Sequence, residues 1–174
     1  MLDECFLEFV LKDLQNPQKH HLKDMQNLFI LKAFTKMYAM PGLRLGYGLC
    51  SDTNLLYRIK QMMQPWNVSL PAQYAGIAAC SETEFGEATR MYISHEREYL
   101  KEKLKKFDFH VYPSQANYLF LDAPSDLYEI CEKEDILIRD CSNYRGLTKG
   151  SYRIAVRTRA ENESLVHILE KYYG

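Results

Sequence analysis

The stretch FILKAFTKMYAMPGLRLGY, residues 29–47, decides the fold and holds the densest cluster of candidate functional groups. The short apolar run from Leu28 to Leu31 is typical of a buried strand. Lys36 follows this strand, and Pro41-Gly42 forms a turn before a second predicted strand over residues 43–49. A lysine that emerges from an apolar strand can lose its hydration, which favours the free amine needed to attack a carbonyl.

Arg44 follows Lys36 by eight residues and lies beyond the turn. It can therefore return to the same pocket, where its planar guanidinium suits a phosphate group. The same spacing also fits a surface lysine and a solvated arginine on either side of a loop. From the spacing alone, both interpretations stay open.

The residues Phe34-Thr35-Lys36, Tyr38-Ala39 and Pro41 to Tyr47 resemble the cofactor-binding segment of the class I/II aminotransferase family, whose members have PLP fold type I. In that family the lysine binds pyridoxal 5'-phosphate (PLP) as an imine, and the arginine eight residues later contacts the cofactor phosphate. The resemblance gives these roles to Lys36 and Arg44. The family often has a serine or threonine three residues before the lysine, where this chain has Ala33.

The run Asp3-Glu4-Cys5-Phe6 resembles the family's Asp-Glu-Ala-Tyr strand end. The resemblance implies that Asp3 pairs with the protonated pyridine nitrogen, which keeps the ring an electron sink. Phe6 stands where the family has a tyrosine that hydrogen-bonds the cofactor. Without the family, Asp3 is only a polar residue near a chain end.

A second cluster contains three arginines on two predicted strands, residues 135–139 and 151–157. Strand alternation places Arg153 and Arg157 on one face with only Ala155 between them, so they need an anion or acidic neighbours. A solvated sheet face explains the pattern equally well. By resemblance, Arg153 binds the substrate α-carboxylate and Arg139 reaches the phosphate of phosphorylated amino-acid substrates. We assign Arg157 to the same substrate site.

Within the family, four details favour the branch that decarboxylates L-threonine O-3-phosphate. They are Phe6, the segment Gln64 to Val68, the loop from Ile136 to Leu147, and Arg157, where histidinol-phosphate aminotransferases usually carry glycine. The resemblance then implies aminopropanol phosphate as product and a place in cobalamin biosynthesis. The alternatives are a histidinol-phosphate or other class I/II aminotransferase, and a non-catalytic α/β interaction module.

Strands and helices alternate along the chain, which predicts an α/β fold. Helices are predicted over residues 52–63 with Asp52 or Thr53 as cap, 72–80, 81 to about 106, 126–132 and 161–172. The family resemblance divides the chain into residues 1–82, a C-terminal remnant of the large PLP-binding domain, and residues 83–174, a small C-terminal domain. The family's N-terminal half is missing, so we expect weak PLP binding and no catalysis by this chain alone. The complete protein is expected to be a homodimer.

The composition excludes several other classes of protein. The formal net charge of −1 shows no bias toward nucleic acid or a membrane surface. The 5 cysteines have no paired or metal-ligand spacing, so we expect free thiols, a cytoplasmic location and no metal site. No apolar run approaches the ~20 residues that would span a bilayer.

Overall fold

The computed structural model describes residues 1–15 and 17–174. The chain forms two compact units, Met1–Arg90 and Met91–Gly174. Helix α3, Thr83–Leu104, contains the division between them. The sequence instead led us to expect a domain boundary between residues 82 and 83, where this helix begins.

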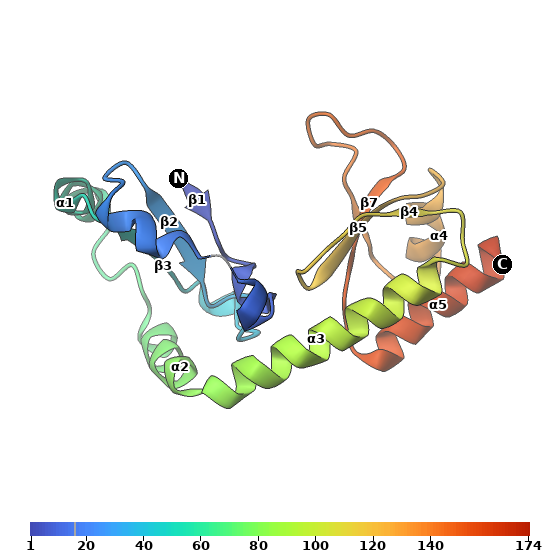
Figure 1. The fold of residues 1–174 in the computed structure, drawn as a ribbon, viewed down its shortest axis with the longest axis horizontal. Coiled ribbons are helices and arrows are strands. Elements are labelled where there is room, and N and C mark those ends of the chain that lie inside the picture. The colour runs from blue at the N-terminus through green and yellow to red at the C-terminus, as the bar shows by residue number, and fades with distance from the viewer. Residues whose placement is uncertain (16) are drawn as a thin grey trace. The chain divides into compact units, whose positions relative to one another are not determined.

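The first unit contains a three-stranded sheet of order β1-β2-β3 (Figure 1). Strand β1, Leu2–Asp3, is parallel to β2, Phe29–Ala33, and β2 is antiparallel to β3, Gly46–Cys50. The strand predicted from the apolar run at residues 28–31 is confirmed as β2. The next predicted strand, residues 43–49, begins later than expected because Pro41–Leu43 forms a 3-10 turn, η4.

Short 3-10 helices connect β1 to β2, and two α-helices follow β3. The 3-10 helices are η1, Leu7–Phe9, η2, Lys12–Leu14, and η3, Gln18–Lys23. The α-helices are α1, Thr53–Met62, and α2, Leu70–Ser81. Asp52 accepts hydrogen bonds from two backbone N–H groups at the start of α1, which confirms the predicted cap. Helix α3 begins two residues after the predicted Ser81, because α2 extends through that residue.

Large hydrophobic side chains are exposed on α1, on α2 and on the segment between these helices. Those with more than half of their surface exposed are Tyr57, Met62, Trp66, Leu70, Tyr74 and Ile77. Apolar surface of this kind commonly marks a site of association. In the described part of the chain, no helix is long and apolar enough to cross a membrane.

The second unit has a four-stranded antiparallel sheet of order β4-β5-β7-β6. The strands are β4, His110–Val111, β5, Tyr118–Asp122, β6, Arg139–Asp140, and β7, Ser151–Ala155. Helix α4 spans Leu127–Lys133 and α5 spans Arg159–Tyr173. The strand predicted over residues 135–139 is wrong in extent, because only Arg139 and Asp140 pair with β7.

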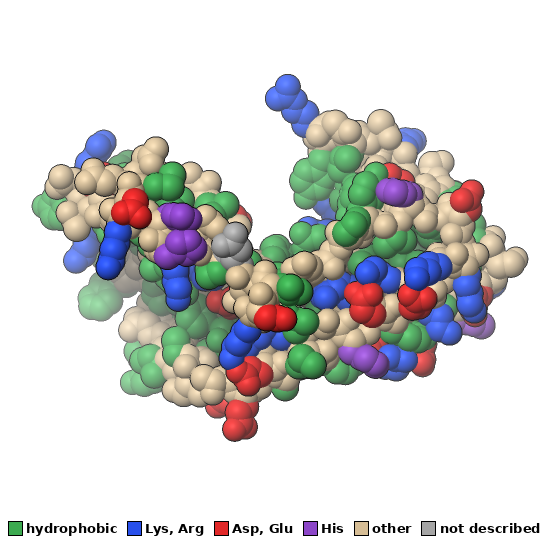
Figure 2. All heavy atoms as spheres, in the orientation of Figure 1, with side chains coloured by type: hydrophobic (Ala, Val, Ile, Leu, Met, Phe, Trp, Pro, Cys, Tyr) green, Lys and Arg blue, Asp and Glu red, His purple; other side chains and the backbone are tan. Residues whose placement is uncertain are grey.

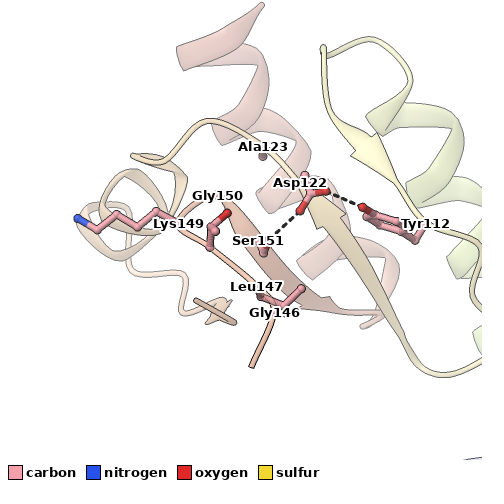
Figure 3. A pocket seen from close by; sticks show the side chains of 9 residues that line it. Tyr112, Asp122, Ala123, Gly146, Leu147, Lys149, Gly150 and Ser151 are labelled. Carbon is pink, nitrogen blue, oxygen red and sulfur yellow. Dashed lines mark hydrogen bonds between the residues drawn. The ribbon is translucent and has the colours of Figure 1, made fainter. Parts of the chain in front are cut away.

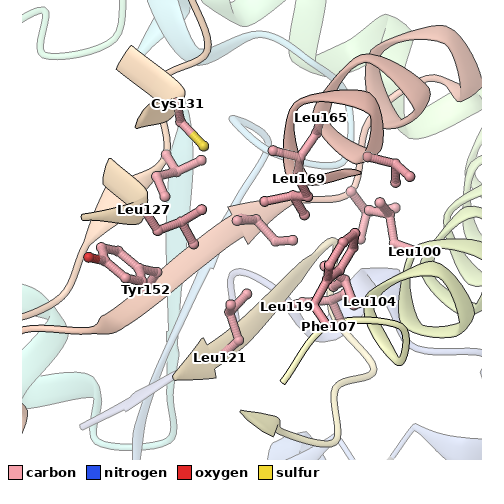
Figure 4. Packing of buried hydrophobic residues seen from close by; sticks show 14 residues of the cluster. Leu100, Leu104, Phe107, Leu119, Leu121, Leu127, Cys131, Tyr152, Leu165 and Leu169 are labelled. Atoms are coloured by element: carbon pink, nitrogen blue, oxygen red, sulfur yellow. The ribbon is translucent and has the colours of Figure 1, made fainter. Parts of the chain in front are cut away.

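The core of the second unit lies between one face of this sheet and helices α3, α4 and α5 (Figure 4). The sheet contributes Leu119, Leu121, Tyr152 and Ile154, each no more than 3% exposed. Leu100 and Leu104 of α3, Leu127 and Cys131 of α4, and Leu165 and Leu169 of α5 pack against them. The strand residues that alternate with this core point to the opposite face.

Charged side chains of both signs alternate over the outer surface of α3 (Figure 2). Lys101 pairs with Glu98 at 3.0 Å, and Lys105 pairs with Glu102 at 2.6 Å. Such spacing stabilises an exposed helix by a few tenths of a kcal/mol per pair. These charged residues therefore form a solvated helix face.

Candidate cofactor site and arginine face

Asp3, Lys36 and Arg44 come from three neighbouring strand ends of the first sheet. Asp3 is the last residue of β1, and Lys36 follows the end of β2 by three residues. Parallel strands end at the same sheet edge, so these two residues share an edge. Arg44 precedes β3, whose first residue, Gly46, pairs with Ala33 at the end of β2. The topology therefore brings the acid, the amine and the guanidinium to one edge.

The loop between β2 and β3 is fixed by backbone hydrogen bonds. Phe34 N donates to Leu45 O at 3.1 Å, and Ala39 N donates to Lys36 O at 3.1 Å. Arg44 has a left-handed φ of 53°, a conformation that residues other than glycine adopt mainly in tight turns. Its guanidinium donates to Pro41 O at 2.8 Å. The loop therefore turns back at Arg44 and returns the chain to the sheet.

The Lys36 amine lies near the segment that carries Asp3. Its Nζ is 5.8 Å from the centroid of the Phe6 ring, three residues after Asp3. The Lys36 side chain is exposed in this chain. The expected loss of hydration at Lys36 is therefore absent here, because the residue lies in the turn beyond β2 rather than within the buried strand. Phe6 supplies an aromatic face and no hydroxyl group.

Asp3 is held as a carboxylate. The Cys5 thiol and the Cys5 backbone N–H, the latter at 2.9 Å from Oδ1, donate hydrogen bonds that lower the pKa of Asp3. Burial and the same hydrogen bond raise the pKa of the Cys5 thiol to about 11, so this thiol keeps its proton. An ionised acid at this edge has the charge needed to stabilise a protonated ring nitrogen.

A partly buried ion-pair network links the segment that follows β1 to β2. Lys32 Nζ lies 3.5 Å from a carboxylate oxygen of Glu4 and 3.8 Å from one of Glu8. Glu4 is 7% exposed and also accepts from Gln18 N at 2.9 Å. Burial raises the pKa of Glu8. Sequence reasoning missed this network, although a lysine inside an apolar strand was a signal for it.

Arg139 and Arg153 lie directly opposite each other on β6 and β7. Directly paired residues of antiparallel strands share a sheet face. Tyr152, Ile154 and Val156 are at most 4% exposed, so the arginines occupy the face opposite the core. The predicted alternation is confirmed.

The contacts of these two arginines are with aromatic and amide groups. The Arg153 guanidinium lies 5.0 Å from the centroid of the Tyr118 ring. Arg139 donates to Asn143 Oδ1 at 3.3 Å and lies 5.6 Å from the centroid of the Tyr144 ring. Two opposed cations repel each other, so this face is electrostatically suited to an anion.

Arg157 already has an acidic partner. Its Nε donates to Glu161 Oε1 at 3.0 Å, and a second guanidinium nitrogen contacts the same oxygen. Glu161 also accepts from the backbone N–H of Thr158 at 3.1 Å, which completes a capping box at the start of α5. An acidic neighbour, one of the two possibilities raised by the sequence, thus offsets the charge of Arg157.

Glu161 gives a prediction about acid stability. The Arg157 hydrogen bonds, followed by those from Thr158, lower the pKa of Glu161 to about 2, against about 4.3 in an unfolded chain. The stability that this carboxylate adds is complete above the unfolded value and is lost as pH falls toward the folded value. We expect Glu161→Gln to flatten the pH dependence of urea unfolding between about pH 4.3 and 2. Glu163→Gln, exposed on the same helix, is the control; equal slopes in both variants would contradict the prediction.

A polar pocket of about 300 Å³ lies along β5 and β7, where sequence reasoning placed nothing. The Asp122 carboxylate accepts from the Tyr112 hydroxyl at 2.7 Å and from the Ser151 hydroxyl at 2.8 Å (Figure 3). The Lys149 side chain points away from these groups in Figure 3. In the described part of the chain, no group of three His, Cys, Asp or Glu residues could hold a metal ion.

The α/β chain thus gathers an acid, an amine and a guanidinium at one sheet edge and two arginines on the open face of a second sheet. The family model for aminotransferase class I and II matches residues 1–169. The chain belongs to the class I and II aminotransferase family, and its fold is that of about half of a PLP fold-type I subunit.

Relatives of two activities resemble the chain to similar extents. A threonine-phosphate decarboxylase of Salmonella typhimurium is 35% identical over 181 residues, covering 97% of this chain and 47% of that protein. A histidinol-phosphate aminotransferase of Methanosphaera stadtmanae is 34% identical over 179 residues, covering 98% of this chain and 47% of that protein. The chain therefore spans about half the length of these relatives.

Solved structures give the same result. The histidinol-phosphate aminotransferase from Clostridium acetobutylicum matches with a TM-score of 0.91 at 32% identity, over 97% of this chain and 52% of that one. The L-threonine-O-3-phosphate decarboxylase from Porphyromonas gingivalis matches with a TM-score of 0.82 at 24% identity, over 98% of this chain and 54% of that one. The second likeness shows the fold alone. These relatives establish the enzyme family and favour neither activity.

Proposed function

We propose that this chain belongs to a PLP-dependent carboxy-lyase that converts L-threonine O-3-phosphate to aminopropanol phosphate. One observation carries the proposal: the sheet edge collects Asp3, Lys36 and Arg44, and a second sheet opposes Arg139 and Arg153 on its open face. The first set suits a phosphorylated pyridine cofactor. The second suits a substrate with two anionic groups.

Pyridoxal phosphate is the cofactor that the family membership indicates. When bound, it supplies an electron sink for the charge that develops at the substrate Cα. The chemistry of these three side chains fits this group: Asp3 would stabilise a proton on the ring nitrogen, Lys36 Nζ would provide the covalent attachment, and Arg44 would bind the phosphate. Phe6 packs against the site and cannot donate a hydrogen bond.

The arginines orient the substrate. Arg153 is proposed to bind the substrate α-carboxylate and Arg139 the substrate phosphate. Arg157 is proposed as a third cation at the same site, although its ion pair with Glu161 partly neutralises its charge. The Lys36 amine is proposed as the group that would return a proton to Cα.

A histidinol-phosphate or other class I/II aminotransferase is the alternative. The aminotransferase from Clostridium acetobutylicum, 32% identical with a TM-score of 0.91, keeps this alternative open. The two reactions would require the same Lys36 and Asp3. They differ in the bond that breaks at Cα, which is the bond to the carboxylate in a decarboxylase and the bond to hydrogen in an aminotransferase. A third possibility is a non-catalytic module in which the arginines bind a protein partner.

One assay separates these functions. The full-length enzyme is incubated with PLP and L-threonine O-3-phosphate, and released carbon dioxide and aminopropanol phosphate are measured. A parallel reaction contains histidinol phosphate and a 2-oxo acid. Carbon dioxide release supports the carboxy-lyase, and amino-group transfer without carbon dioxide supports the aminotransferase. Neither activity, in protein that binds no PLP, supports the module.

The biological setting follows from the same proposal. The product places the enzyme in cobalamin biosynthesis, in the cytoplasm, and the assembly is proposed to be a homodimer with no nucleic-acid or membrane partner. The exposed apolar side chains of α1 and α2 are suited to such association. By itself, the 174-residue chain is proposed to bind PLP weakly and to lack turnover.

Arg153→Ala tests the substrate role of the arginine face. Loss of one charge-assisted contact of about 1.5–3 kcal/mol should raise KM for L-threonine O-3-phosphate by roughly 10- to 100-fold. Steady-state kinetics with varied substrate measure this change. Arg58→Ala, an exposed arginine on α1, is the control and should leave KM unchanged. An unchanged KM in Arg153→Ala would remove this residue from the substrate site.

A further inference from the structure

The end of β7 is closed by a side chain where a neighbouring strand would otherwise lie. Strand β6 pairs only with Tyr152 and Arg153, so it stops before Arg157. There, Arg157 N donates to Asn162 Oδ1 at 3.0 Å, and Asn162 Nδ2 donates to Arg157 O at 3.0 Å. One amide group thus satisfies both backbone groups of Arg157, as an antiparallel partner residue does.

Asn162 is itself fixed by a buried network. It is 1% exposed, and its second N–H donates to Glu96 Oε2 at 2.9 Å. Glu96, 2% exposed, accepts from Arg159 Nε at 3.1 Å and from Arg159 NH2 at 2.9 Å. The Arg159 guanidinium lies 3.6 Å from the centroid of the Tyr99 ring. The network joins α3 to α5, and the amide of Asn162 uses one acceptor and both donors.

Capping of α5 does not require Asn162. Thr158 and Glu161 already form the capping box at the start of this helix. Asn162 instead turns inward to the backbone of Arg157, two residues beyond the end of β7, and to Glu96. A buried polar network with every group satisfied specifies one geometry more sharply than apolar packing does. Asn162 therefore determines where the backbone lies just beyond the end of β7.

Arg153 lies between two fixed points on this strand. The backbone of Arg153 pairs with Arg139 on β6 and with Phe120 on β5. Beyond it, Val156 N donates to Asn117 O at 2.9 Å, and the next residue is held by Asn162. Hydrogen bonds on alternating sides thus hold the backbone in place as far as Arg157. They restrict the directions in which the Arg153 and Arg157 guanidinium groups can point.

We infer that Asn162, supported by Glu96 and Arg159, is a positioning residue that fixes the substrate arginines Arg153 and Arg157. It acts through the backbone of β7 and touches neither cofactor nor substrate. The inference rests on the proposed function, because it assigns the purpose of the network to the arginine face. It adds a determinant of substrate affinity that lies outside the arginine cluster itself.

Asn162→Ala tests this inference. A misplacement of about 1 Å can cost up to ~10²-fold, and we expect KM for L-threonine O-3-phosphate to rise about 10-fold while kcat changes less than about 3-fold. Hydrogen exchange, followed in the same protein, should show faster exchange of the Arg157 amide. The control is Tyr173→Phe, which removes a 2.9 Å hydrogen bond from α5 to Asp126 and should change neither KM nor that amide.

Glu96→Gln is the second variant, used also if Asn162→Ala does not fold. It keeps an acceptor for Asn162 but removes the charge that holds Arg159, so its effects should have the same direction and a smaller size. Faster Arg157 exchange with an unchanged KM would overturn the positioning role and leave the proposed function intact. Slow Arg157 exchange in Asn162→Ala would also overturn it. A parent enzyme without activity on either substrate would refute the proposed function, and the inference with it, whatever the exchange rates.

Discussion

Lys36→Ala should lose at least about 10²- to 10⁴-fold in turnover, the contribution of a single group that transfers protons in the transition state. The variant should also fail to form the covalent attachment to PLP that absorbs visible light. Lys36 follows β2 at the sheet edge that also receives Asp3 and Arg44, and no other lysine of the first unit follows a strand end at that edge in the described residues.

The measurements are initial rates of the full-length enzyme with L-threonine O-3-phosphate and absorbance spectra of its PLP-loaded form. Lys60→Ala, an exposed lysine on α1, is the matched control and should keep both properties. Undiminished turnover in Lys36→Ala would show that another group performs the chemistry.

Glu96→Ala should destabilise the second unit by about 3–5 kcal/mol, the cost of removing one partner of a buried ion pair. The Glu96 side chain is 3% exposed, and the change leaves Arg159 and one N–H of Asn162 without an acceptor. The Arg159 side chain is 39% exposed and recovers some hydration, which places the expected loss toward the lower value. Arg159 lowers the pKa of Glu96, so the carboxylate is ionised when the pair forms.

Urea unfolding followed by far-ultraviolet circular dichroism measures the change. Glu98→Ala on the same helix is the control: Glu98 is 55% exposed and pairs with Lys101 at the surface, which should be worth no more than about 1 kcal/mol. Equal losses in the two variants would contradict a structural role for the buried pair.

Local patterns allowed much of the fold to be predicted from the sequence. The cap at Asp52 depends on residues two and three positions away, and the alternation at Tyr152, Ile154 and Val156 depends on strand geometry. Both are short-range effects, and both are confirmed. The extent of β6 was not predictable in this way, because it depends on where β7 separates from its neighbour.

The candidate site was predictable where a motif marks it and not where distant residues meet. The shared sheet edge of Asp3, Lys36 and Arg44 follows from strand direction once the pairing is known. The contact between Glu96 and Asn162 joins residues 66 positions apart, and no local signal indicates it. The exposure of Lys36 likewise depends on which parts of the protein cover the turn.

Location of the PLP attachment tests the central claim most directly. The chain is mixed with PLP, reduced with borohydride, digested, and mapped by mass spectrometry for phosphopyridoxyl-lysine. We predict that Lys36 carries the dominant label and that Asp3→Asn and Arg44→Ala each reduce it, while Lys60 and the other surface lysines carry little. Label concentrated on another lysine, with Lys36 unmodified, would contradict the assignment of this sheet edge as the cofactor site.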